Sequence, residues 1–521
     1  MQNDYVQQLK LVTSAAANHY SACIAAAKKL KTMLDDDLQS GTTTQDEWAL
    51  VAFTCSSALI NFADHTKNKQ AAELGTLFAD DARGFEYIEH YVERNLEYNA
   101  ANGRVVQYLI AAGDTIDSAT HVSSRLLHRN LLREARTLFS LVGYDKTVAG
   151  TLRGTALCNL ANQLDDSGRW VEAYQIYVDA LDADPTNGNA AGNAAELLRR
   201  RISSGRGQLG HYAAVHDALL RQAHKHRVRT VELAGEATAQ RWDDAPFLEG
   251  HGHLEHAGDP LNPYQQWIKD HRLALTFAVD GLGSDDPRWD SATIESLRVT
   301  SADIPPIYAS INVLKAEYLV SRRLAFSGEQ KLYETPFGQN AEDTGVYVDT
   351  LDMAVYGEAS SSLVLAQRST LDILDKVAVA ANEHFATGDT PGSVTFRKFW
   401  VKGNPPAIRS GLPIEVDRWT PSALCLTELA YDAQPDGLYA SAQALRNAGT
   451  HRLVNLSWGA PKTEANSAHV PVEADYLVSA AHQSLTVARA AFLYLLDLVA
   501  DKEEAHPSEG PVGSLPLYFQ D

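Results

Sequence analysis

Two apolar stripes at helical spacing, in residues 154–187, constrain the fold of this chain more than any other feature. Apolar residues three and four positions apart form the first stripe: Leu157, Leu160, Ala161 and Leu164. A polar break follows at Asp166, Ser167 and Gly168. The second stripe combines small and large apolar residues before Pro185 ends it: Trp170, Ala173, Tyr177 and Ala180. The pattern predicts two antiparallel helices that interlock.

This helix pair resembles a tetratricopeptide repeat. Every diagnostic position is filled except the aromatic positions of the first helix, where Leu157 and Leu164 stand. One such unit cannot bury its own apolar face, so we expect further helix pairs to stack on it. Neighbouring stripes support this expectation: Ala191, Ala194, Ala195 and Leu198 one period on, and Ala135 and Phe139 upstream. The alternative is an isolated helical hairpin.

The whole chain of 521 residues is predicted to be all-α. Strand signals are scarce, whereas helical periodicity and helix starts recur, as at Thr44 followed by Asp46 and Glu47. The length is enough for roughly three or four domain-sized units. The predicted organisation has five parts. They are a helical region (1–145), tetratricopeptide-like repeats (146–235), an irregular connecting segment (236–306), a helical bundle (307–505) and a tail (506–521).

Charge and composition exclude several classes of protein. The net charge of −21 means that any contact with nucleic acid depends on a local basic patch, not on overall attraction. The four cysteines form no CxxC pair, so the sequence indicates neither a zinc ribbon nor a disulfide framework. The N-terminal sequence has no signal-peptide pattern, and no stretch approaches 18 uninterrupted apolar residues. We therefore expect a cytoplasmic protein without membrane association.

A basic island interrupts this acidic chain at residues 199–229, and Arg199, Arg200 and Arg201 open it. Clustered guanidinium groups are suited to holding RNA phosphates, so these three arginines are candidate RNA-binding residues. The alternative is a solvated helix face, which is the more common role of a charge run.

The C-terminal part contains four long helical segments, the number needed for a four-helix bundle. They span about 307–327, 345–386, 420–456 and 473–504. Between the second and third, residues 391–419 contain Phe396, Phe399 and Trp400 and are predicted to form an ordered excursion, not a linker.

The third segment ends with the residues best suited to chemistry, Arg446, Asn447 and His451. A guanidinium, an amide and an imidazole that titrates near neutral pH are the groups needed to cleave a phosphodiester. An offset of five residues separates Arg446 and His451 by about 140° around an ideal helix. They would share a face only if the helix ended or kinked, and Gly449-Thr450 offers such a weak point. The alternative is a surface arginine and a capping histidine.

In this context the motif resembles the RN-x-x-x-H motif of the HEPN superfamily, helical nucleases of prokaryotic defence and toxin systems. The resemblance is to the branch in which a tetratricopeptide region precedes the HEPN domain. Similar stretches outside the motif are NLANQLDDSGRWVEA, YQQWIKDHRLAL, INVLKAEYLVSRRL, VYG, LDKVA, ALCLTEL and ARAAFLYL. Gly449-Thr450 stands where this branch usually carries Leu-Glu.

The resemblance implies an endoribonuclease that needs neither a metal ion nor a cofactor. It implies that His451 is the general base on a ribose 2′-hydroxyl, that Arg446 stabilises charge on the phosphate, and that Asn447 orients the histidine or binds phosphate. The products would carry 2′,3′-cyclic phosphate and 5′-hydroxyl ends. It further implies a homodimer with a composite site, and a protein trigger or antitoxin on the repeat region.

Other readings of the C-terminal half remain open. Lys315 and Arg322 both lie on the first bundle helix, within two turns of each other. They are weaker RNA-binding candidates, because residues of this kind more commonly form ion pairs between helices. The loop sequence HGHLEH, with His251, His253 and His256, offers imidazoles to zinc but matches no strong metal signature. The main alternative function is a catalytically inactive scaffold whose bundle serves dimerisation.

Overall fold

Helices account for most of the part of the chain that the computed structural model describes, which confirms the all-α prediction. The described residues are 8–10, 12–13, 20–113, 117–249, 260–282, 289–294, 297–298, 304–335, 341–351, 353–415, 420–459, 467–505 and 512–513.

The chain divides into two compact units that interleave in sequence. The first comprises Met1–Leu164, Ile176–Asn193 and Arg221–Ala245, and the second comprises Asp165–Gln175, Ala194–Leu220 and Pro246–Asp521. This division passes through four helices between residues 150 and 225. The boundaries that we placed at residues 145 and 235 stay a prediction.

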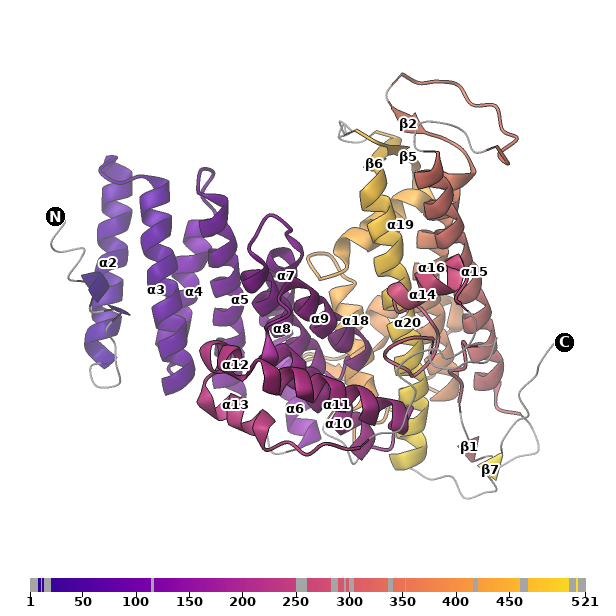
Figure 1. Ribbon diagram of the computed structural model, residues 1–521, viewed down its shortest axis with the longest axis horizontal. Coiled ribbons are helices and arrows are strands. Elements are labelled where there is room, and N and C mark those ends of the chain that lie inside the picture. Colours follow the sequence, from indigo (N-terminus) through magenta and orange to yellow (C-terminus); the bar gives the residue numbers. More distant parts are fainter. Residues whose placement is uncertain are drawn as a thin grey trace. The chain divides into compact units, whose positions relative to one another are not determined.

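The first unit begins with a row of alanine-rich helices, and α2 to α5 lie side by side in Figure 1. Their bounds are α2 (Tyr20–Ser40), α3 (Gln45–Thr66), α4 (Lys69–Arg83), α5 (His90–Ala112), α6 (Ser118–Leu127), α7 (Arg129–Tyr144) and α8 (Gly150–Asp166). Small residues let these helices approach closely: a Cβ atom added at Gly103 of α5 would lie 2.1 Å from Oγ1 of Thr76 in α4.

The helix start predicted at Thr44 is confirmed, and it is a reciprocal capping box. The backbone N–H of Glu47 donates to Oγ1 of Thr44 at 3.2 Å, and the backbone N–H of Thr44 donates to the Glu47 carboxylate at 2.9 Å. Two backbone donors that the helix leaves without partners are thereby satisfied.

We expect Thr44→Ala to lower the stability of the first unit by about 1 kcal/mol, because it removes the side-chain acceptor at the N-cap. Thr54→Ala is the matched control, since the Thr54 hydroxyl only donates to the Leu50 carbonyl of the same helix. Thermal unfolding followed by circular dichroism would test this prediction. Equal losses in the two variants would contradict it.

The repeat-like region forms consecutive helices with the predicted stripes buried. After α8 come α9 (Trp170–Ala183), α10 (Gly188–Ser203), α11 (Leu209–Lys225), α12 (Arg227–Ala234) and α13 (Glu236–Asp243). All eight residues of the two stripes are at most 4% exposed. The break falls at Gly168, whose φ of +75° favours glycine. These helices agree with stacked helix pairs, and their assignment to the tetratricopeptide family stays a prediction.

The second unit is built around a bundle in which α15 packs along α16, and α20 contacts both (Figure 1). The bundle helices are α15 (Pro306–Glu334), α16 (Glu358–His384), α18 (Ser422–Asp432), α19 (Ala440–His451) and α20 (Ala474–Ala505). An additional short helix, α14 (Pro263–Asp270), precedes them.

Two of the four predicted bundle segments differ from the structure. The second begins only at Glu358, because Gly357 adopts a φ of +122° outside helical space. The third is two helices, since Gln434-Pro435-Asp436-Gly437 forms a turn after α18 and Asp436 has a φ of +66°. There the Tyr439 backbone N–H donates to the Asp432 carbonyl at 2.9 Å.

A three-stranded sheet, which the sequence analysis did not predict, covers one end of the bundle (Figure 1). Its order is β2 (Ala354–Val355), β5 (Leu453–Ser457) and β6 (His469–Glu473), with β5 parallel to β6. The buried pair Leu456 and Val472 joins the sheet to a core that includes Leu445 and Leu477 of the bundle helices. The sheet therefore anchors the C-terminal end of α19.

The remaining elements are short. They are β1 (Leu297–Arg298) paired with β7 (Val512–Gly513), β3 (Val401–Lys402) paired with β4 (Ala407–Ile408), the 3₁₀ helix η1 (Pro391–Ser393) and α17 (Phe396–Phe399). Phe396, Phe399 and Trp400 are buried, which confirms the predicted ordered excursion for its described residues 391–415.

Among the described helices, α20 alone is long and apolar enough, by length and composition, to cross a membrane. In this structure 83% of its apolar window is buried, as in the core helix of a bundle.

Candidate functional site

Helix α19 carries all three motif residues in its last two turns. The helix continues through Gly449 and Thr450 and ends at His451, where the Arg452 backbone N–H still donates to the Ala448 carbonyl. The hydroxyl of Thr450 donates to the Arg446 carbonyl at 2.9 Å, as in a regular helix. The expectation that Gly449-Thr450 breaks the helix is therefore wrong. The helix is supported from outside, since Arg368 of α16 donates to the Gly449 carbonyl at 3.2 Å.

Two carboxylates of α16 hold the Arg446 side chain. Its Nε and Nη2 donate to Oδ1 of Asp372 at 3.0 and 2.6 Å, and Nη2 lies 3.4 Å from Oδ2 of Asp375. Asp372 and Asp375 are three residues apart and therefore share one face of α16. Within the described part of the chain, Nη1 of Arg446 has no hydrogen-bond acceptor. The guanidinium is thus oriented from one side and retains a donor.

Asn447 and His451 point to solvent. Both are exposed, and they lie four residues apart on one face of α19. The described residues place no hydrogen-bond partner on either side chain. Because the helix is unbroken, Arg446 lies about 140° from His451 around the axis. A single chain thus directs the arginine toward α16 and presents the amide and the imidazole outward.

A groove between α15 and α16 begins beside the motif. Its volume is about 480 Å³, and it is lined by Arg368 and Asp372, two of the α16 residues that contact α19. Farther along, the exposed pair Lys376 and Glu317 bridges α16 and α15. The groove is therefore lined by acidic and basic side chains, and one of them, Asp372, also contacts Arg446.

The α16 residues that position the motif were not predicted from the sequence. The signal was present in LDILDKVA, where Asp372 and Asp375 are spaced to meet one arginine. The sequence alone did not show that this helix packs against α19.

The structure corrects the prediction for the basic island. Arg201 is 6% exposed, its Nη1 lies 2.8 Å from Oδ2 of Asp497, and its guanidinium lies 4.3 Å from the Trp170 ring centroid. Burial removes Arg201 from the candidate RNA-binding residues. Arg199 and Arg200 are partly exposed but paired, with Glu196 and Asp165.

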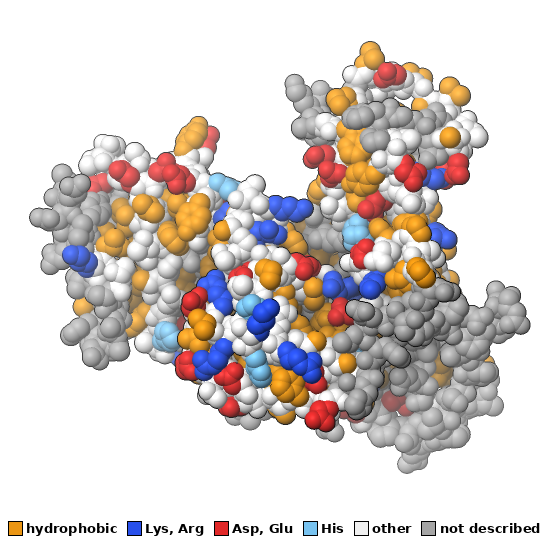
Figure 2. All heavy atoms as spheres, in the orientation of Figure 1, with side chains coloured by type: hydrophobic (Ala, Val, Ile, Leu, Met, Phe, Trp, Pro, Cys, Tyr) orange, Lys and Arg blue, Asp and Glu red, His pale blue; other side chains and the backbone are white. Residues whose placement is uncertain are grey.

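The end of the island shows the same neutralisation. Arg227 pairs with Glu236 and with Asp243, and Arg229 pairs with Glu232 at 2.8 Å. Figure 2 shows acidic and basic side chains interspersed over α12 and α13. This part of the island is therefore a solvated, ion-paired helix surface.

Lys315 and Arg322 are also structural. Arg322 is 2% exposed and forms a two-fold ion pair with Asp290, with contacts of 2.8 and 2.7 Å. Lys315 donates to the Asp290 carbonyl at 3.0 Å, and its burial lowers the pKa of its ammonium group. Neither side chain lines an open RNA cleft, because both hold Asp290 against α15. The histidines of HGHLEH lie outside the described residues.

Comparison with known proteins decides the identity of the bundle. Residues 298–502 match the family model of the LA2681-like HEPN domain. The C-terminal part of this chain is a HEPN domain. The match covers α15 to α19 and most of α20, and it includes Arg446, Asn447 and His451, so the predicted resemblance to the HEPN superfamily is confirmed.

No curated protein and no solved structure matches the chain. HEPN domains are typical of nuclease, RNA-related or toxin-like proteins. The family match describes the function of this chain only in these general terms. The helices before residue 298 lie outside the match.

Proposed function

We propose that this protein is a metal-independent endoribonuclease of HEPN type, acting in the cytoplasm as a toxin or antiphage effector. His451 removes the proton from a ribose 2′-hydroxyl, which then attacks the adjacent phosphate. Arg446 stabilises the charge that develops on the phosphate, and Asn447 orients the imidazole or contacts a phosphate oxygen. The reaction leaves a 2′,3′-cyclic phosphate and releases the 5′-oxygen as a hydroxyl.

The observation that carries this proposal is the orientation of Arg446 by Asp372 and Asp375. An arginine bound through Nε and Nη2 keeps a fixed plane, and its remaining Nη1 donors are directed to one place. Nearby, Asn447 and His451 present an amide and an imidazole on one face of the same helix. These groups are suited to a phosphodiester and require no metal ion.

The geometry also supports a homodimer with composite sites. An unbroken helix separates Arg446 and His451 by about 140°, so a second protomer is needed to bring both to one phosphate. The bundle offers an apolar surface for it: Val313, Val320 and Leu365 are 53%, 62% and 47% exposed on α15 and α16. We propose that the repeat-like region binds a protein trigger or antitoxin.

The first test is incubation of the purified full-length protein with total cellular RNA in EDTA, beside His451→Ala, followed by mapping of the new RNA ends. We expect cyclic-phosphate ends from the native protein and none from the variant. Cleavage that requires a divalent ion, or that leaves 5′-phosphate ends, would overturn the proposed chemistry.

A second expectation concerns the positioning of Arg446. Asp372→Asn removes the negative charge that holds Nε and Nη2, so we expect about 10- to 100-fold slower cleavage with the RNA affinity little changed. Glu383→Gln is the matched control, because Glu383 is exposed on the same helix. Single-turnover cleavage and RNA binding, measured separately, would show whether the cleavage rate falls while the RNA affinity stays unchanged. An equal loss in both variants would contradict the positioning role.

The alternative is a catalytically inactive scaffold, and one observation favours it. Asp372 and Asp375 both lie against Arg446, in a chain whose net charge is −21. If the two carboxylates cancel the charge of the guanidinium so that it does not attract phosphate, the domain would dimerise without cleaving RNA. In that case Asp372→Asn would raise RNA affinity instead of slowing cleavage, so the same variant separates the two functions.

A further inference from the structure

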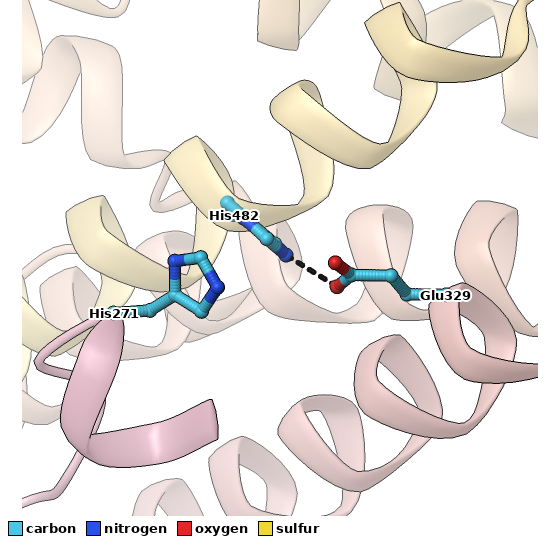
Figure 3. Close-up of side chains that lie close together, drawn as sticks. All are labelled: His271, Glu329 and His482. Atoms are coloured by element: carbon cyan, nitrogen blue, oxygen red, sulfur yellow. Dashed lines mark hydrogen bonds and ion pairs between the residues drawn. The ribbon is translucent and has the colours of Figure 1, made fainter. Parts of the chain in front are cut away.

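Three side chains from different elements meet in the second unit, away from α19. His271 follows α14, Glu329 belongs to α15 and His482 belongs to α20, and Figure 3 shows their side chains converging. One ligand atom of each lies within 4.8 Å of the corresponding atoms of the other two. Two imidazoles and one carboxylate are a common ligand set for zinc and other first-row divalent metals.

The carboxylate is oriented by its surroundings. Oε2 of Glu329 accepts from Nε2 of His482 at 2.6 Å and from the indole N–H of Trp267 at 2.9 Å. Both hydrogen bonds hold the pKa of the Glu329 carboxyl below its usual value despite burial. Oε1 has no hydrogen-bond donor among the described residues. An outer hydrogen bond to a ligating carboxylate is typical of metal sites.

The His271 ring packs against Trp267 and His482. Its imidazole makes no hydrogen bond to the described residues, although the ring centroid lies 4.2 Å from that of His482. The nitrogens of the His271 ring are therefore available to ligate a metal ion. The side chains of His482 and Glu329 are 20% and 19% exposed, so an ion can enter from solvent.

We propose that His271, Glu329 and His482 bind one divalent transition-metal ion of the zinc type, which ties the end of α14 to α15 and α20. Tetrahedral bonds of about 2.0–2.1 Å require ligand atoms about 3.3 Å apart, so the side chains close by up to about 1.5 Å on binding. A solvent molecule completes the coordination. This site is separate from the proposed cleavage site, because the residues proposed for RNA cleavage lie on α19.

The test uses untagged full-length protein, stripped with a chelator, desalted and titrated with ZnCl₂. We expect one ion per chain by elemental analysis and a higher unfolding temperature. In Co²⁺-substituted protein we expect the visible absorption of a tetrahedral site. His271→Ala and Glu329→Gln should weaken zinc binding at least about 100-fold, and Trp267→Phe, which keeps all three ligands, about 10-fold.

Two controls identify the site. His451→Ala removes an exposed histidine on α19 and should bind zinc as the native protein does. Replacing His251, His253 and His256 together by alanine tests the other histidine cluster and should also leave binding unchanged. No bound zinc in the native protein, binding retained in His271→Ala, or binding lost with the second cluster would each overturn the proposal.

Discussion

Alanine at Arg446 or at His451 is expected to lower RNA cleavage by at least about 1000-fold. A positioned general base contributes about 10²- to 10⁴-fold, and a charge-stabilising donor at the phosphate contributes a similar factor. The fold should persist, because His451 is exposed and the Arg446 side chain is 26% exposed. Circular dichroism and light scattering would confirm an intact fold and oligomeric state. Full activity in either variant would refute these catalytic roles.

A mixture of the two inactive variants provides the sharpest form of this test. If each site takes Arg446 from one protomer and His451 from the other, a mixed dimer contains one complete site. Random exchange in a two-fold dimer would restore about one quarter of native activity. If both groups came from one protomer, every site would stay incomplete and no activity would return. The unbroken α19 favours restoration of activity. If no activity returned, the two residues would act within one chain.

The helices could be predicted because the sequence signals that specify a helix lie within a few consecutive turns. The stripes around Leu157 and Tyr177 are buried as the spacing predicts, and Thr44 begins a helix because its hydroxyl caps the Glu47 backbone N–H. The motif on α19 and the HEPN assignment also followed from residues close in sequence. Each of these predictions needed only a few consecutive turns.

The remaining features depend on pairings between distant segments. Strands β5 and β6 form a parallel pair separated by residues 458–468, and neither is stable without the other. Asp372 acquires its role only when α16 lies against α19. Arg201 looked like a phosphate ligand because the sequence shows its charge but not Asp497, which neutralises it 296 residues later.

A buried ion cluster in the second unit depends on such distant pairing. Arg169 follows the turn at Gly168, and its guanidinium contacts the carboxylates of Glu172 and Asp432. All three side chains are at most 2% exposed. The hydroxyl of Tyr439 donates to Glu172 as well. Burial opposes the charge on Arg169, but the two carboxylates outweigh it and raise the pKa of Arg169 well above its usual value.

Arg169→Ala is therefore expected to destabilise the second unit by about 3–5 kcal/mol, because it leaves two carboxylates buried without their counter-ion. In a domain of this size, such a loss lowers the unfolding temperature by at least about 5 °C. Arg169→Met should cost nearly as much, since the two carboxylates remain without a cation. Differential scanning calorimetry of the full-length variants would measure both losses.

Arg199→Ala is the matched control for this loss, because Arg199 and Glu196 are also three residues apart on a helix but are 45% and 29% exposed. Water screens such a pair, and its removal is expected to cost about 0.5 kcal/mol or less. Both arginines pair with a glutamate three residues away, but the expected losses differ several-fold because Arg169 is buried and also neutralises Asp432. Similar unfolding temperatures for Arg169→Ala and Arg199→Ala would show that the buried cluster does not hold the turn after α8 against α18.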